Sequence, residues 1–188
     1  MSVVGILLAA GRGERFGGDK LRADVSGERV GVVACRHLLA AVHDVVAIVR
    51  PMDDLLAVAF AAAGARVIRC ANADDGMGAS LACGVLATID ATGWVVALAD
   101  MPWIQPETIA RVATAIDEGA PVAAPFYRGE RGHPVGFGRT CAAALTALTG
   151  DGGAKAVVAE HRAAMVRIDV DDSGVLRDVD TEDDLTAT

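Results

Sequence analysis

The chain has 188 residues, of which 53% are hydrophobic and only 4% aromatic. This length and composition fit one domain with an aliphatic core, and they exclude a disordered chain. A formal net charge of −8 argues against a surface that binds nucleic acid, so an anionic ligand would need a local cluster of basic residues.

Apolar runs alternate with segments of helical periodicity along the chain. In order, the pattern predicts a strand at 3–9, a helix at 30–41, a strand at 45–49, a helix at 52–63, a short strand at 66–69, a helix at 79–89 and a strand at 94–98. It then predicts a helix at 104–116, a strand at 122–125, an irregular hairpin at 127–137, short helices at 140–148 and 154–161, and a strand at 165–170. We expect Asp180 or Thr181 to cap a final helical turn.

This alternation predicts an α/β protein of a single domain, residues 1–188, with three layers (αβα) and a mostly parallel sheet. Ligands in such sheets bind at the carboxyl ends of the strands. A glycine-rich segment follows the first predicted strand, and Asp100 follows the fourth. We therefore expect these two features to meet at one edge of the sheet.

The glycine-rich segment from Leu8 to Lys20 reads L-A-A-G-R-G-E-R-F-G-G-D-K. Glycines let the backbone approach a ligand closely, and successive backbone N–H groups can hold phosphates. The basic residues Arg12, Arg15, Lys20 and Arg22 lie within eleven residues of one another. Arg15 offers a planar fork for phosphate oxygens, and Lys20 offers a mobile point charge. The segment predicts a loop that holds a nucleoside triphosphate.

Two other interpretations of this segment are open from the residues alone. It could be a surface turn with solvated charges. Its Gly11-x-Gly13-x-x-x-Gly17 pattern is also close to a dinucleotide-binding fingerprint, although the spacing differs by one residue and Arg50 stands where a ribose-binding carboxylate is expected. A Walker A loop is excluded, because Lys20 has no preceding glycine and no following Ser or Thr.

Motifs along the whole chain carry a resemblance to a known family. L-A-A-G-x-x-x-R-x-G-x-x-K resembles the signature loop of nucleotidyltransferases with a glycosyltransferase-A-like (nucleotide-diphospho-sugar transferase) fold. Further motifs are similar to those of the family: N-A-D-D-G-M-G-A-S-L at 72–81, A-D-M-P at 99–102 and D-V-D-T at 178–181. Two others, G-H-P-V at 132–135 and G-D-G-G-A-K at 150–155, resemble its molybdenum cofactor branch. Phe16, Gly31, Lys155 and Glu182 depart from the family pattern, but none of them removes a candidate catalytic group.

The resemblance implies Mg²⁺-dependent transfer of a nucleoside monophosphate to a phosphorylated acceptor, with Mn²⁺ as an alternative metal. It implies catalytic roles for Arg15, Lys20 and Asp100, and metal binding by Asp100 and Asp180. The residues it implies for nucleotide binding are Leu8, Ala9, Ala10, Gly11, Arg12, Gly13, Lys20, Gly78 and Ser80, and those for the acceptor pocket are His133 and Pro134.

Structural roles compete with these functional ones. Asp100 is compatible with a turn, and Asp180 with a helix cap or a solvated acidic tail. Ser80 is compatible with a helix cap and His133 with a structural hydrogen bond.

Two details resemble the cytidylyl branch of the family more than the guanylyl branch. The turn reads L-A-A-G rather than L-A-G-G, and Arg15 and Lys20 are five positions apart. The resemblance therefore implies CTP as the donor and a molybdopterin-type acceptor. A guanylyltransferase, or an enzyme for another small-molecule phosphate, is the alternative within the fold. An NAD(P)-dependent oxidoreductase and a non-catalytic nucleotide-binding module are the alternatives from other classes.

The four cysteines, Cys35, Cys70, Cys83 and Cys141, form no C-x-x-C pair, and each has apolar neighbours. This usage is typical of buried thiols in a reducing cytoplasm. No run reaches the roughly 18 apolar residues of a membrane span. We expect a cytoplasmic protein with small-molecule substrates and without a membrane or nucleic-acid partner. A molybdoenzyme maturation protein is a candidate partner by resemblance.

Overall fold

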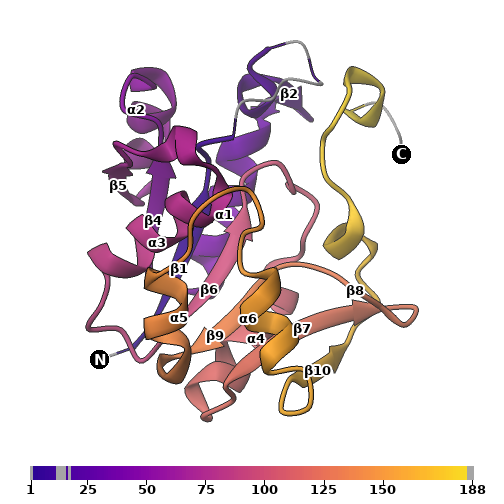
Figure 1. Ribbon diagram of the computed structural model, residues 1–188. Helices are drawn as coiled ribbons and strands as arrows, with labels where there is room; N and C mark the ends of the chain where they lie inside the picture. The colour runs from indigo at the N-terminus through magenta and orange to yellow at the C-terminus, as the bar shows by residue number, and fades with distance from the viewer. Residues whose placement is uncertain (1, 12–15, 17, 186–188) are drawn as a thin grey trace.

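Eight strands form one mixed sheet in the computed structural model, which describes residues 2–11, 16 and 18–185 (Figure 1). The strand order is β10-β7-β9-β6-β1-β4-β5, with β8 paired to β7. The bounds are β1 (Val3–Leu8), β4 (Asp44–Val49), β5 (Arg66–Arg69), β6 (Gly93–Leu98), β7 (Val122–Tyr127), β8 (Glu130–Arg131), β9 (Val135–Gly138) and β10 (Val166–Asp169). The predicted α/β class with a mainly parallel central sheet is confirmed.

The centre of the sheet is β1, which pairs in parallel with β4 on one side and with β6 on the other. Each of these strands is an apolar run that is buried along most of its length, as parallel strands covered on both faces require. Leu8 is in register with both Ile48 and Leu98. The chain therefore leaves all three strands at one edge, where the predicted meeting of the glycine-rich segment with Asp100 is confirmed.

The other half of the sheet differs from the sequence prediction. The expected hairpin at 127–137 is only partly present, because β9 is inserted in the sheet antiparallel to both β6 and β7, while β8 turns back on β7. A Cβ on Gly136 would lie 2.5 Å from Ile116 Cγ1 of α4 (Pro106–Asp117), so glycine lets this helix pack directly on β9. Hydrophobic periodicity detects such a strand but does not specify its neighbours.

Helices cover both faces of the sheet and make it the middle of three layers (Figure 1). Helices α1 (Val30–Ala41), α2 (Asp54–Ala63) and α4 pack on one face, and α3 (Met77–Ala87), α5 (Ala142–Thr146) and α6 (Lys155–Glu160) pack on the other. Successive residues of a strand point to opposite faces. In β1, accordingly, Leu7 packs with the first set of helices and Ile6 with the second.

Capping residues explain the helix boundaries. Helix α1 spans the predicted residues. Helix α2 begins at Asp54 because Asp53 is its N-cap, with a carboxylate that accepts from the Leu56 N–H at 3.2 Å. Gly64, with a φ of 109°, ends this helix. Helix α3 begins two residues before its predicted start, and α4 begins two residues after it, with a proline in its first turn.

Short elements complete the fold, and of these the sequence indicated only the final helical turn, η6, and the residues of η4 that overlap the helix predicted at 140–148. A hairpin of β2 (Asp24–Val25) and β3 (Glu28–Arg29) follows the glycine-rich segment. The 3₁₀ turns are η2 (Lys20–Arg22), η3 (Ala73–Asp75), η4 (Arg139–Cys141), η5 (Ser173–Leu176) and η6 (Glu182–Leu185). Within the described ranges, the protein has no helix whose length and apolarity would let it cross a membrane.

Candidate active site

A cavity of about 570 Å³ opens at the edge of the sheet where β1, β4 and β6 end. This volume lies in the range of small-molecule sites. Its walls come from the turns after these strands, from η2, from the start of α3 and from two later segments. The lining residues are Leu8, Ala9, Ala10, Gly11, Phe16, Lys20, Leu21, Arg50, Ala73, Asp74, Gly76, Met77, Ser80, Leu98, Asp100, Asp151 and Asp180.

The turn after β1 forms one wall of the cavity. Ala9 and Ala10 are small and buried, and the Ala9 N–H donates to the Ile48 carbonyl at 2.9 Å. This bond extends the parallel pairing one residue beyond the strand and fixes where the turn begins. Six of the predicted nucleotide-binding residues line the cavity, of which this turn supplies four, Leu8, Ala9, Ala10 and Gly11, and the others are Lys20 and Ser80. Three further predictions, Arg12, Gly13 and Arg15, lie outside the described residues.

Lys20 joins two carboxylates that come from distant parts of the chain. Its Nζ lies 2.7 Å from Asp100 Oδ2 and 3.6 Å from Asp180 Oδ1. The Lys20 and Asp100 side chains are 15% and 21% exposed, so their ion pair is partly shielded from water and stronger than a surface pair. The structure thus brings together three residues to which the family resemblance implies catalytic or metal-binding roles.

The second carboxylate oxygen of Asp100, Oδ1, is buried and has no hydrogen-bond partner among the described residues. Leaving a buried carboxylate oxygen unpaired is costly, so this atom fits a position that a bound cation would satisfy. The described side chains contain no group of three or more His, Cys, Asp or Glu residues that could hold an ion alone. A metal here would need oxygens from phosphate and water, which is how Mg²⁺ is commonly bound.

A third carboxylate lies near this pair. Partial desolvation and the charges of Asp180 and Asp100 raise the pKa of Asp178, while Lys20 lowers it. Three acids and one ammonium therefore influence one another at the same end of the cavity. The sequence placed Asp178 in the D-V-D-T motif but predicted no role for it.

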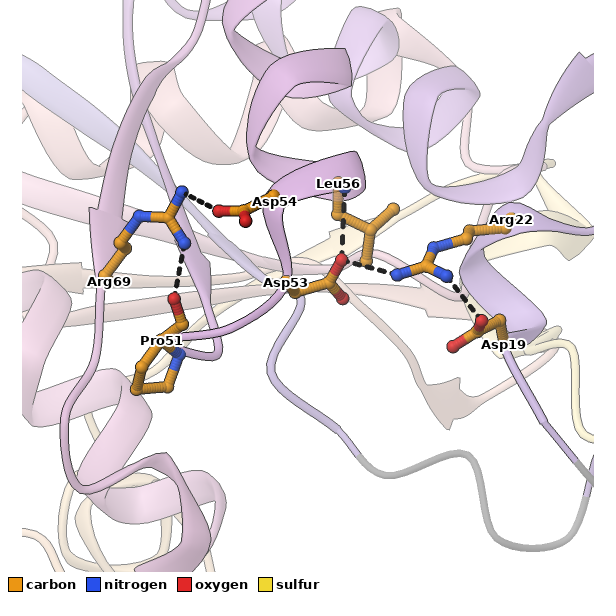
Figure 2. A network of polar contacts seen from close by, with 7 residues as sticks. All are labelled: Asp19, Arg22, Pro51, Asp53, Asp54, Leu56 and Arg69. Atoms are coloured by element: carbon orange, nitrogen blue, oxygen red, sulfur yellow. Dashed lines mark hydrogen bonds and ion pairs between the residues drawn. The ribbon is translucent and has the colours of Figure 1, made fainter.

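Arg22 anchors the segment that contains Lys20 (Figure 2). Its Nη1 lies 2.6 Å from Asp19 Oδ2, and its Nη2 lies 2.7 Å from Asp53 Oδ1. The Asp53 N–H donates to the Arg50 carbonyl at 3.2 Å. The charge of Arg22 is therefore used within the protein, and this member of the basic cluster supports the position of Lys20.

A second arginine stabilises the turn between β4 and α2 (Figure 2). Arg69 donates from Nη1 to the Pro51 carbonyl, and its Nη2 lies 2.6 Å from Asp54 Oδ1. These bonds hold both ends of the turn. Arg50, the first residue after β4, therefore extends from a well-supported backbone.

The start of α3 forms another wall. Gly76 has a φ of 108°, and a Cβ there would lie 2.5 Å from Asp151 Oδ1, so only glycine admits the loop of Asp151 this closely. The Gly78 N–H donates to the Gly150 carbonyl at 2.8 Å and is thus used within the protein. Ser80 lies in the first turn of the helix and donates to the Gly76 carbonyl at 3.4 Å. The interpretation of Ser80 as the cap is wrong, because Gly76 occupies the N-cap position.

His133 and Pro134 are joined by a cis peptide bond, precede β9, and are not among the described residues that line the cavity. The His133 N–H donates to the Val175 carbonyl at 2.9 Å, and its Nδ1 is buried without a partner in the described part of the chain. Burial, and then the charge of Arg131, lower the pKa of His133 to about 4, and Asp100 opposes this shift. The imidazole is therefore neutral at neutral pH.

The C-terminal segment places Asp180 beside Asp100. The Val179 N–H donates to the Asp100 carbonyl at 2.8 Å. Asp184 Oδ2 accepts from the N–H groups of Thr181 and Asp180 at 2.7 and 3.0 Å, and from the Thr181 hydroxyl at 2.9 Å, which lowers the pKa of Asp184. Asp184 thus organises the final turn, η6, which begins directly after Thr181, and the capping role of Asp180 or Thr181 stays a prediction.

Sequence reasoning assigned no role in the cavity to Arg50, Asp74 and Asp151. Arg50 donates from Nε to the Ala10 carbonyl at 3.0 Å, and its Nη2 lies 2.5 Å from Asp74 Oδ1. Their positions in the sequence could have indicated a role for all three residues. Arg50 directly follows a strand at the carboxyl edge of the sheet, and the two acids lie inside motifs of the family resemblance.

Comparison with known proteins agrees with this geometry. Residues 5–165 match the family described as MobA-like NTP transferase domain. The purine catabolism protein PucB of Bacillus subtilis (strain 168) is 26% identical over 193 residues, which cover 97% of this chain and 93% of PucB. Among solved structures, Rv0371c of Mycobacterium tuberculosis H37Rv has a TM-score of 0.83 and 28% identity, covering 99% of this chain and 96% of Rv0371c. The nucleotidyl transferase Mth528 of Methanothermobacter thermautotroptrophicus shares the fold, with a TM-score of 0.84 and 23% identity over 98% of this chain and 94% of its own.

The sheet topology and the cavity at its carboxyl edge define a protein of the nucleotide-diphospho-sugar transferase fold, whose structural neighbours are nucleotidyltransferases. Because the family match covers most of the chain, the protein belongs to the MobA-like NTP transferases. It is therefore a nucleotidyltransferase that acts on small molecules, and the near-fingerprint at Gly11–Gly17 gives no support to an oxidoreductase.

Proposed function

We propose that this nucleotidyltransferase moves CMP from CTP onto a phosphorylated acceptor of the molybdopterin type and releases pyrophosphate. The observation that carries the proposal is the meeting of Lys20, Asp100 and Asp180 in a cavity of about 570 Å³. A chain with a net charge of −8 has no broad attraction for a triphosphate, so a local cation in a shielded site is needed.

We propose Mg²⁺ as the metal, with Mn²⁺ as a substitute. Asp100 and Asp180 would hold the ion, and the buried, unpartnered Oδ1 of Asp100 supports this assignment. A second structure of Rv0371c, aligned to this chain at 27% identity, is a complex with manganese. When bound, such an ion neutralises charge on phosphate oxygens and orients them.

The chain itself contributes positioning and charge. In the proposed reaction an oxygen of the acceptor phosphate attacks the α-phosphorus, and the bond from this phosphorus to the bridging oxygen of the β-phosphate breaks, so that pyrophosphate leaves. Lys20 and Arg15 would neutralise the triphosphate and the leaving pyrophosphate. This chemistry needs alignment of the reacting groups more than a protein nucleophile.

The remaining binding roles are proposals of the same kind. The backbone of 8–11 would hold the base and sugar, and Ser80 would contact the nucleotide from the opposite wall. Arg12 and Gly13 would complete the phosphate contacts, whereas Gly78, whose N–H donates to the Gly150 carbonyl, would let the loop at 149–150 pack closely against the start of α3. His133 and Pro134 would shape the acceptor pocket, and the influence of Asp100 on the pKa of His133 supports a place near the reacting end.

The choice of CTP rests on the L-A-A-G turn and on the interval between Arg15 and Lys20. A thermal-shift panel of CTP, GTP, UTP and ATP with Mg²⁺ tests it, because a ligand that binds the native state stabilises it by mass action. We expect the largest shift with CTP. A larger shift with GTP would favour the guanylyl alternative, and a shift with NADPH alone would contradict nucleotidyl transfer.

The acceptor is tested separately, by pyrophosphate release. With CTP and Mg²⁺ present, we expect release when molybdopterin is added and much less with a simple sugar phosphate. Equal or greater release with the sugar phosphate would assign the enzyme to another small-molecule phosphate.

A further inference from the structure

We propose that Arg50 reads the base of the bound nucleotide and favours cytosine over guanine. This assignment rests on the proposed function of the cavity, and it names the residue that sets the donor. It comes from the position of Arg50, from its two hydrogen bonds and from the hydrogen-bonding groups of the bases.

The position of Arg50 suits the base end of the cavity. Arg50 and Asp100 follow β4 and β6, which flank β1 on opposite sides. Neighbouring strands lie about 4.8 Å apart, so the two backbone positions stand about 10 Å apart across the sheet edge. Both residues line the same cavity, with the turn at Ala10 between them. A nucleotide whose phosphates reach Lys20 and Asp100 therefore extends toward Arg50.

Two hydrogen bonds to different segments hold the Arg50 guanidinium. Nε donates to the Ala10 carbonyl at 3.0 Å, and Nη2 donates to Asp74 Oδ1 at 2.5 Å. Its backbone is also restrained, because its carbonyl accepts from the Asp53 N–H. A planar guanidinium with two anchored nitrogens has a defined orientation, and the side chain is still 31% exposed to the cavity mouth or solvent. Among the described residues no hydrogen bond uses Nη1, whose two N–H groups are thus available to a ligand.

The bases differ in what they offer to such a donor. The pairing edge of cytosine presents two adjacent acceptors, O2 and N3, next to its N4 amino donor. The same edge of guanine presents one acceptor, O6, followed by two donors. A donor facing the guanine N1–H would be left unpaired in a shielded site, which is a strong basis for discrimination. Guanine offers two adjacent acceptors, O6 and N7, only on its other edge, so Arg50 matches cytosine when the pairing edge of the base faces Nη1.

The test compares equilibrium binding of CTP and of GTP, each with Mn²⁺, by calorimetry, so that no acceptor is needed. Arg50→Gln removes the charged donor, and Arg50→Lys keeps the charge but loses the anchored Nη1. Arg66→Gln is the matched control, because Arg66 makes a two-bond ion pair with Asp44, both at 3.0 Å, at the opposite edge of the sheet. Thermal unfolding without nucleotide verifies that each variant folds.

We expect Arg50→Gln to weaken CTP binding by about 10- to 100-fold and GTP binding much less, as loss of a hydrogen bond from a charged donor does. Arg50→Lys should lose most of the preference for CTP even if it retains affinity, whereas Arg66→Gln should keep both. An equal loss for the two nucleotides, or a larger loss for GTP, would overturn the role of Arg50 while leaving the proposed function intact. If the wild type binds neither nucleotide, the proposed function itself fails, and if it prefers GTP, both fail.

Discussion

The ammonium of Lys20 lies 2.7 Å from Asp100 Oδ2, although the two residues are separated in sequence by five strands and three helices. The phosphates of a substrate would compete with Asp100 for the three N–H donors of this ammonium, so binding of substrate by Lys20 is expected to favour opening of the ion pair. A divalent cation on Asp100 favours this opening, because like charges at such distances repel in a shielded site. Metal binding and the release of Lys20 toward the triphosphate are thus expected to be linked.

Replacement of Lys20 tests this relationship. Lys20→Gln should lower kcat by about 100-fold or more, because one preorganised cation contributes a few kcal/mol to the transition state. Steady-state pyrophosphate release measures the change. The exposed pair of Arg36 with Glu28 provides a control, and Arg36→Gln should retain the wild-type rate. A near-normal rate in Lys20→Gln would contradict its assigned role.

The same variant makes a prediction about metal binding that does not depend on turnover. Without nucleotide, Lys20→Gln should bind Mn²⁺ more tightly than the wild type, because no ammonium competes for Asp100 and Asp180. The electron paramagnetic resonance signal of free Mn²⁺ gives this affinity directly. Weaker Mn²⁺ binding in the variant would mean that Lys20 and the metal do not share these carboxylates.

The two carboxylates should differ in importance. Asp100→Asn should reduce Mn²⁺ affinity and kcat more than Asp180→Asn, because Asp100 is less exposed (21% against 40%) and has the buried, unpartnered oxygen. Both substitutions keep the side-chain shape. Asp169→Asn, which changes an exposed pair with Arg167, is the control for loss of a surface charge. If Asp100→Asn keeps wild-type Mn²⁺ affinity, Asp100 is not a metal ligand.

Substitution of two adjacent acids, Asp53 and Asp54, tests whether Asp53 and Arg22 hold the segment that contains Lys20 in place (Figure 2). Asp53→Ala removes both the cap of α2 and the partner of Arg22, so we expect a loss of about 1 kcal/mol in the free energy of unfolding together with a lower kcat. Asp54→Ala changes an acid that is 77% exposed and pairs with Arg69, where exposed pairs contribute about 0.5 kcal/mol or less. Urea unfolding and pyrophosphate release measure the two effects. Equal behaviour of the variants would show that Asp53 does not position Lys20.

The buried imidazole of His133 predicts a pH effect on stability. Its pKa falls from an ordinary value of 6.5 to about 4 in the folded protein. Between these two pH values the unfolded chain binds more protons than the folded one. The contribution of His133 to the free energy of unfolding is therefore complete above about pH 6.5 and is lost as the pH falls toward 4. One proton contributes a slope of at most about 1.4 kcal/mol per pH unit.

Urea unfolding measures this pH effect on stability when the wild type and His133→Gln are compared between about pH 4.5 and 7.5. The wild type should lose more stability than the variant as the pH is lowered, because the variant cannot take up this proton. Parallel curves would mean that His133 titrates alike in the folded and unfolded protein.

The central strands and two of the site residues could be predicted from the sequence for a physical reason. Continuous apolar runs such as 3–9 and 94–98 are typical of buried parallel strands, and residues that follow such strands meet at one edge. Lys20 and Asp100 were therefore identified from local pattern and motif together. Asp180 lies in an acidic stretch without a local signal, and only the family resemblance pointed to it.

Features that depend on long-range packing could not be predicted. Strand β9 lies between β6 and β7, where α4 packs closely on Gly136, and periodicity encodes neither the strand order nor this contact. The bonds of Arg50 to Ala10 and Asp74 join segments far apart in the sequence, so no spacing rule reveals them. The single-domain assignment and the roles of the individual site residues stay predictions.

The most direct test of the central claim is the fate of the α-phosphate of CTP. Purified protein is incubated with Mg²⁺, molybdopterin and CTP labelled at the α-phosphorus, and the products are separated. The account predicts that the label moves to the acceptor as CMP while one pyrophosphate is released for each transfer, and that Lys20→Gln slows both together. Label that stays in CTP, or that is transferred faster from GTP, would contradict it.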